Sequence, residues 1–281
     1  MKRHVVLHSL LIILLLFSTL GFSQESYMLK YNFVKGKTYL QTTQIVNNIT
    51  QSMMGREMKQ LSDITSNVEM NIEDVASDGR ITMIVAVLDA AVHTSFMGKD
   101  TTIQLKDLKD KDRVVISSEG KTLSSTKINP SDSTGMMAQL KNVSKMQLLP
   151  GRLVKIGEKW QNNIVDSTQA SEGNPFSTNI SNMMEYSLIG KENKDGKNLL
   201  KIAYSGTLNI TGKGVQMGME MFMEGTGKTE GFLYFDPVKS FVIYDENNTE
   251  MDLSIAVTGP QNMTIPMTQS MKSVSKIEEK K

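Results

Sequence analysis

The chain has 281 residues, of which 39% are apolar and 22% are charged, and its 31 basic side chains nearly balance its 30 acidic ones. This composition is typical of a folded globular protein rather than a disordered one, and it excludes the dense basic surface that nucleic-acid binding requires. No cysteine is present, which excludes disulfides, thiolate metal sites, cysteine nucleophiles and a lipid anchor on cysteine.

Residues 1–23 have the pattern of a secretory signal peptide. A positive start and an apolar stretch over 5–20 precede Gly21-Phe22-Ser23, which places small residues at the −3 and −1 positions of a cleavage site before Gln24. The alternative is a retained anchor helix, but the uninterrupted apolar core over 10–17 is shorter than the about 20 residues that a spanning helix prefers. We therefore predict export, cleavage before Gln24, and a mature chain that does not span the membrane.

The first half of the mature chain alternates apolar and polar residues with a period of two, which is typical of half-buried antiparallel strands. The segment 67–73 is a clear case, while 81–92 is apolar in both phases and is expected at the centre of a sheet. Turn sequences separate these runs, and they predict hairpins at Asp78-Gly79, Met97-Gly98 and Glu119-Gly120.

A change of period after Asn129-Pro130 predicts the one helix. Met136, Leu140 and Val143 fall at helical spacing, and Pro150-Gly151 ends the pattern. We predict an amphipathic helix over 133–147 that covers the concave face of the sheet or closes one of its ends.

Period-two alternation resumes in 200–210 and 251–258, and 232–235 is apolar in both phases. Pro266 interrupts the last run, 263–274. Because proline cannot donate a hydrogen bond to a ladder, that run is predicted to be an edge strand or to carry a bulge. Turn sequences mark further hairpins at Asp195-Gly196, Asp236-Pro237 and Gly259-Pro260.

These elements predict a mainly β protein. Residues 24–281 are expected to form a single domain, with a structured core at about 27–275. Its fold would be a long curved antiparallel sheet or incomplete β-barrel, a meander of hairpins with one covering amphipathic helix, because long strands twist and curl. An outer-membrane barrel would alternate in the same way. It should also show aromatic girdles, whereas aromatic residues are 6% of this chain.

The sequence offers no convincing catalytic, metal or nucleotide site. His93 is the single histidine beyond the leader, and no Gly-x-Ser-x-Gly motif marks a nucleophile. The segment 225–229 matches the end of a phosphate-binding loop, but Phe222 replaces its first glycine. The acidic residues of 106–113 alternate with basic ones, which favours a solvated loop over a calcium site. We predict no enzymatic activity, no cofactor, no metal and no nucleotide or nucleic-acid partner.

Methionine is unusually abundant, with 21 residues. Thioether side chains adapt to ligands of variable shape, bind Cu(I), or replace leucine in a core. Plain core packing is favoured, and a ligand-facing apolar pocket and then a soft-metal site are the alternatives that stay open. The predicted lining of the pocket comes from one strand face and from the helix, and comprises Met217, Met219, Met221, Met223, Met136 and Leu140.

Three groups of residues resemble an uncharacterised family, a domain of unknown function, of exported β-rich proteins from Bacteroidota-type Gram-negative bacteria. The first is Tyr31-x-Phe33-x-x-Gly36-x-x-Tyr39, the second comprises Leu149-Pro150, Val154, Gly157 and Trp160, and the third comprises Gly231 and Tyr234-Phe235-Asp236. The resemblance spans about 27–275 and implies the periplasm or the cell envelope. The family has no established activity, so no site residue is implied.

A curved sheet with one covering helix is similar in shape to the periplasmic carriers of lipoproteins, which is an analogy of fold. We expect an exported, non-enzymatic protein that binds a hydrophobic small molecule or lipid on the concave face of its sheet. The alternative is a structural or protein-interaction component of the cell envelope without a small-molecule ligand.

Overall fold

A computed structural model describes residues 25–53, 55–106, 108, 110–129, 146–170, 176–216, 218–259 and 262–280. Within these ranges the chain forms strands and no helix. The predicted leader lies outside the described residues. The predicted helix over 133–147 does too, apart from Met146 and Gln147, which have no regular secondary structure.

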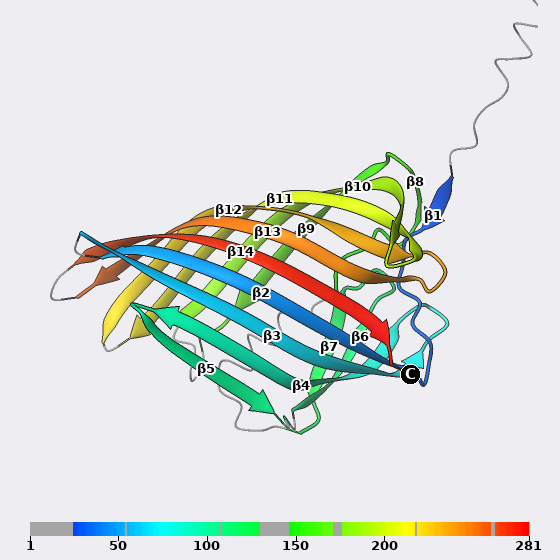
Figure 1. Ribbon diagram of the computed structural model, residues 1–281, viewed down its shortest axis with the longest axis horizontal. Coiled ribbons are helices and arrows are strands. Elements are labelled where there is room, and N and C mark those ends of the chain that lie inside the picture. The colour runs from blue at the N-terminus through cyan, green and yellow to red at the C-terminus, as the bar shows by residue number, and fades with distance from the viewer. Residues whose placement is uncertain are drawn as a thin grey trace, which may run out of the picture.

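One long antiparallel sheet contains most of the strands, and it is strongly curved without closing into a barrel (Figure 1). This confirms the predicted fold class, while the covering helix is not among the described elements. From edge to edge the sheet comprises β7 (Thr122–Lys127), β6 (Lys111–Ile116), β4 (Ile81–Phe96), β3 (Arg56–Val75), β2 (Thr38–Met53), β14 (Met263–Glu279), β13 (Phe241–Thr258), β12 (Met219–Asp236), β11 (Lys197–Gln216), β10 (Phe176–Lys194) and β9 (Lys159–Thr168).

Three short strands complete the fold. β5 (Lys99–Lys106) pairs with β4, while β1 (Ser26–Met28) and β8 (Leu153–Lys155) form a separate two-stranded sheet. In the large sheet, β2 pairs with β14 from Tyr39 opposite Glu279 to Gln51 opposite Met267. This pairing joins the N-terminal half of the sheet to the C-terminal half, and Figure 1 shows the two strands side by side.

The main hydrophobic core lies at one end of the sheet. Phe33 stacks on Phe241 with 5.5 Å between ring centroids and meets Tyr39 edge to face at 4.8 Å. Trp160 stacks on Tyr186 at 5.5 Å. The segments before β2 and before β8 close this end, and their backbones are hydrogen-bonded to the loop between β6 and β7. The aromatic residues of the first two groups that carry the family resemblance are therefore part of the core; these are Tyr31, Phe33, Tyr39 and Trp160.

Glycines on the concave face of β11 and β12 allow the sheet to curve sharply. A Cβ on Gly225 would lie 2.4 Å from Cδ2 of Leu253, and a Cβ on Gly231 would lie 2.3 Å from the carbonyl oxygen of Glu246. Gly206 and Gly227 have comparably close neighbours. Because no side chain is present at these positions, large side chains of the adjacent strands fill the space.

The hairpin predictions hold at two tight turns. Met97-Gly98 has φ values of 52° and 75°, and Asp195-Gly196 has values of 53° and 73°. Two consecutive residues with positive φ form the turn type whose twist matches that of antiparallel strands.

Two sequence-based expectations differ from the structure. Phe232 is 40% exposed although it belongs to a segment expected to be covered on both sides; the ammonium of Lys201 lies 4.4 Å from its ring centroid and covers it instead of an apolar layer. The prediction that 263–274 is an edge or bulged strand is wrong, since β14 pairs regularly with β13 and β2. Pro266 fits because the pairing with β2 begins only at Met267.

Replacing Gly231 with alanine should lower the free energy of unfolding by about 1–3 kcal/mol, because the new methyl group meets backbone rather than a flexible side chain. Gly212 is the matched control, since a Cβ there would first meet the mobile Cε of Met223 at 3.1 Å. Urea denaturation should show a clear loss for Gly231→Ala and little change for Gly212→Ala. Equal losses would contradict the close-approach explanation.

Candidate functional site

The concave face of the sheet contains a cavity of about 360 Å³ beside the core. Segments from both halves of the chain and from the connections that cross the core end form its wall. The polar part of that wall comprises Tyr31, Gln41, Thr43, Gln147, Asp245, Asn247, Ser273 and Ser275.

Asp245 of β13 is the one acidic side chain among the described residues of the cavity wall. The hydroxyl of Tyr204 donates a hydrogen bond to its Oδ1 at 2.6 Å, and Nε2 of Gln147 donates to its Oδ2 at 2.5 Å. Loss of hydration raises the pKa of Asp245, and the same effect raises the pKa of the neighbouring Tyr186 to about 12. Tyr204 reaches Asp245 across β12 because Gly231 has no side chain.

A second polar group lies where β2 pairs with β14. Gln41 is 4% exposed, and its Nε2 donates to Oγ of Ser275 at 3.0 Å. The hydroxyls of Thr43 and Ser275 share a hydrogen bond at 3.1 Å. Oε1 of Gln41 is buried without a hydrogen-bond partner among the described residues. An unpaired buried carbonyl is costly unless a ligand or water satisfies it.

The concave face becomes apolar on the side of the cavity away from the core. Alternate residues of β12, β13 and β14 point to the same side as Asp245, because the registers of these strands align them. We call this surface the apolar trough. It comprises Met219, Met221, Met223, Met251, Leu253, Ile255, Val257, Met263, Ile265, Met267 and Met271.

Three of the predicted ligand-binding residues, Met219, Met221 and Met223, share the trough as expected, and each is half-buried. The opposite phase of β12 is exposed, including Phe222 at 48%. The other three predicted residues, Met217, Met136 and Leu140, lie outside the described residues.

The polar cavity was missed by the sequence interpretation. Asp245, Asn247 and Thr249 continue the phase of the apolar run 251–257, so three polar residues in that phase were the available signal. Gln41 and Thr43 stand in the same relation to Ile45 on β2. Polar residues that interrupt the buried phase of a strand are candidates for a site because each needs a partner.

The residues considered for catalysis lie apart from the cavity. His93 is on β4, where its Nδ1 is 3.0 Å from the hydroxyl of Thr102. The segment 225–229 lies within strand β12 rather than before a helix, so it lacks the geometry of a phosphate-binding loop. In the described ranges, no group of three His, Asp or Glu side chains is placed to hold a metal. The same ranges contain no helix that is long and apolar enough to span a membrane.

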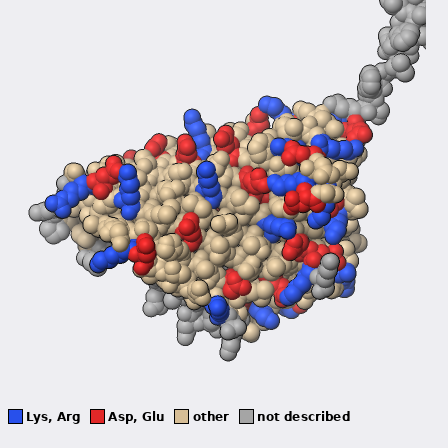
Figure 2. Space-filling model, in the orientation of Figure 1, with Lys and Arg blue, Asp and Glu red and all other residues tan. Residues whose placement is uncertain are grey.

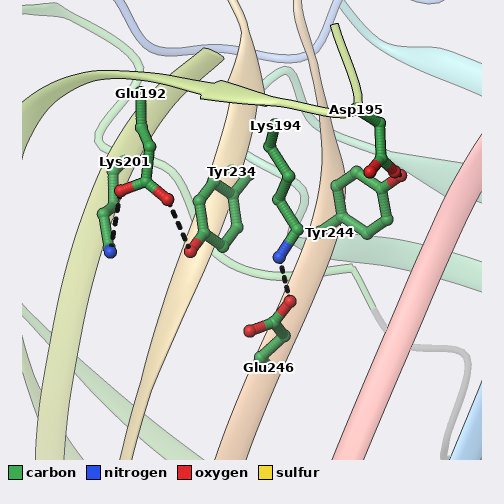
Figure 3. Close-up of polar contacts among 7 residues, drawn as sticks. All are labelled: Glu192, Lys194, Asp195, Lys201, Tyr234, Tyr244 and Glu246. Carbon is green, nitrogen blue, oxygen red and sulfur yellow. Dashed lines mark hydrogen bonds and ion pairs between the residues drawn. The ribbon is translucent and has the colours of Figure 1, made fainter. Parts of the chain in front are cut away.

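A charged network lies on the opposite face, over the ends of β10 and β11 (Figure 3). Lys194 pairs with Glu246, and its ammonium lies 4.0 Å from the ring centroid of Tyr234. Lys201 pairs with Glu192 at 2.8 Å. The groups satisfy one another, which indicates a structural role in fastening the β10–β11 hairpin to β12 and β13. Elsewhere on the face shown in Figure 2, basic and acidic side chains are interspersed.

Replacing Asp245 with asparagine should remove one component of the pH dependence of stability. A carboxyl whose pKa is raised by folding stabilises the folded state as it gains its proton. This contribution grows as pH falls through the raised value and is complete below the ordinary value of 3.8. The stability of the wild type relative to Asp245→Asn should therefore increase as pH falls from about 7.5 to about 4.5. Urea midpoints at several pH values measure this, and parallel curves would contradict it.

Comparisons with known proteins give distant structural likeness alone. No family model and no curated protein matches the chain. Among solved structures, OccK2 from Pseudomonas aeruginosa matches with a TM-score of 0.32 and 7% identity, over 88% of this chain and 99% of that one. The hypothetical lipoprotein YmcC from Escherichia coli matches with a TM-score of 0.23 and 11% identity, over 85% of this chain and 89% of that one.

Proposed function

We propose that this protein is an exported, non-enzymatic binding protein that holds an elongated apolar ligand, such as the acyl chain of a lipid, in the apolar trough. The observation that carries the proposal is a continuous concave surface of methionine, isoleucine and leucine side chains that are mostly only half-buried among the described residues.

Such a surface has a physical cost that a ligand would remove. Burying apolar area stabilises by about 25 cal/mol per Å², so side chains left half-exposed forgo much of that free energy. Contiguous apolar patches of this kind on soluble proteins commonly mark binding sites. Methionine suits the role because its unbranched thioether adjusts to ligands of different shape.

The site of action that we propose is the periplasm or the cell envelope of a Gram-negative bacterium. The leader pattern of 1–23 and the resemblance to exported β-rich proteins support it. A binding protein exported to that compartment would meet lipids at both enclosing membranes.

A stability comparison tests whether the trough is a surface or a second core. Met70 is 2% exposed, and Met70→Ala should cost about 2–5 kcal/mol, as for other buried methionines. Met221 is half-buried, so Met221→Ala should cost less than about 2 kcal/mol because it leaves no sealed void. Chemical denaturation of both variants measures the difference. Similar large costs would indicate ordinary core packing instead of a ligand-facing surface.

Binding of an uncharged fluorescent probe, N-phenyl-1-naphthylamine, tests the proposed function directly. Met221→Glu should weaken binding at least about tenfold, because a charge in the trough must lose hydration when the ligand covers it. Phe222→Glu is the control, since Phe222 is the next residue of β12 and points to the opposite, exposed side. Absence of probe binding to the wild type, or equal weakening in both variants, would overturn the proposal.

A further inference from the structure

The polar cavity and the apolar trough share Met271 at their boundary. Met271 lines the cavity together with Ile45, Ser273 and Ser275. Along β14, Met271 is followed on the same face by Gln269 and Met267. A ligand that fills the trough can thus extend directly into the cavity.

Resting on the proposed function, we infer that the cavity receives an uncharged, hydroxyl-bearing head group, such as the glycerol of a monoacylglycerol, while the acyl chain lies in the trough. The two parts of the site would bind the two parts of one amphiphilic ligand.

The hydrogen-bonding groups beside β2 and β14 match a hydroxyl. Ser275 accepts from Gln41 and shares one hydrogen bond with Thr43. Whichever hydroxyl donates in that shared bond, the other keeps a hydrogen that it can donate elsewhere. The free Oε1 of Gln41 supplies an acceptor. Each ligand hydroxyl donates one hydrogen bond and accepts others, so it can satisfy both groups at once.

The charge of the cavity disfavours an anionic head group. No lysine, arginine or histidine is among the described residues that line it. A carboxylate or phosphate would instead face Asp245 and the unpaired oxygen of Gln41, and the described part of the wall supplies no cation to offset the loss of hydration.

A cationic head group is also less favoured than a neutral one. Both carboxylate oxygens of Asp245 already accept hydrogen bonds, from Tyr204 and Gln147. The groups that remain free, on Gln41 and on the Thr43–Ser275 pair, are uncharged. An ammonium would have to displace one of the existing donors to reach the charge.

The length of the concave face is adequate for the chain of such a ligand. From Ser275 to Met267 on β14 the strand rises by about 26 Å, at about 3.3 Å per residue. An acyl chain spans about half of a bilayer core that is about 30 Å thick. The trough therefore accommodates one extended chain with its head group at the cavity.

Displacement of N-phenyl-1-naphthylamine by three amphiphiles of equal chain length tests the inference. We expect a monoacylglycerol to displace the probe at a concentration at least about tenfold lower than the corresponding fatty acid or alkylamine. Such a factor corresponds to about 1.4 kcal/mol, within the range for one or two hydrogen bonds made or lost.

Gln41→Leu should reduce this preference about threefold to tenfold by removing the free acceptor, and Thr43→Val should reduce it by removing a hydroxyl. Gln44→Leu is the control, because Gln44 is exposed on the other face of the same strand. Circular dichroism checks the fold, and we expect the same β-sheet spectrum for all three variants. Thr43→Val tests the site independently of Gln41→Leu, and it suffices when the spectrum of Gln41→Leu shows misfolding.

The outcomes separate the two proposals. If the probe binds and the fatty acid or the alkylamine displaces it as well as the monoacylglycerol, the head-group inference is overturned while the proposed function stands. An unchanged preference in both Gln41→Leu and Thr43→Val would also overturn the inference. If neither the probe nor any amphiphile binds, the proposed function itself fails.

Discussion

The antiparallel pairing of β2 with β14 is the contact on which the rest of the structure depends. It joins residues 39–51 to residues 267–279 and makes one continuous sheet from two halves of the chain. Without it, Gln41 and Thr43 would not face Ser275, and the cavity would lose one wall. The pairing also closes the longest loop of the sheet, a step whose entropic cost must be offset by the contacts that it makes.

Curvature imposes a second constraint, on the size of the side chains inside. The concave side of a bent sheet has less room than the convex side. In β11 and β12 several inward positions are glycine, and their neighbours across the ladder are large, such as Leu253 opposite Gly225. The same arrangement positions the site, since Tyr204 extends over Gly231 to donate to Asp245. Each glycine loses more backbone conformational freedom on folding than another residue would. The missing side chains at these glycines nevertheless make the curved face and the cavity possible.

The division of the concave face into core, polar cavity and apolar trough follows the strands along their length. Along β13, Phe241 belongs to the core, Asp245 to the cavity and Leu253 to the trough. In the function that we propose, an amphiphile lies along the strands of this sheet, and the packed aromatic core prevents it from extending past the cavity. This zoning makes one head-to-tail orientation of a ligand more favourable than the reverse.

Much of the fold could be predicted because strand periodicity is local. The phases of 200–210 and 251–258, the turn at Asp195-Gly196 and the shared face of Met219, Met221 and Met223 all follow from spacing within a few residues. The error at Pro266 has the complementary cause: whether a strand is an edge depends on which other strands flank it, and β14 lies between β13 and β2.

By itself, the sequence determined the class of the fold, the two faces of strands such as those at 67–73, 200–210 and 251–258, and the side on which methionine gathers, because alternation along a strand depends only on neighbouring residues. The tertiary structure alone decided that the first long strand lies against the last and that Gln41, Thr43, Asp245 and Ser275 enclose one cavity. Residues more than two hundred positions apart in the chain meet there through the order of the strands, and local spacing contains no information about that order.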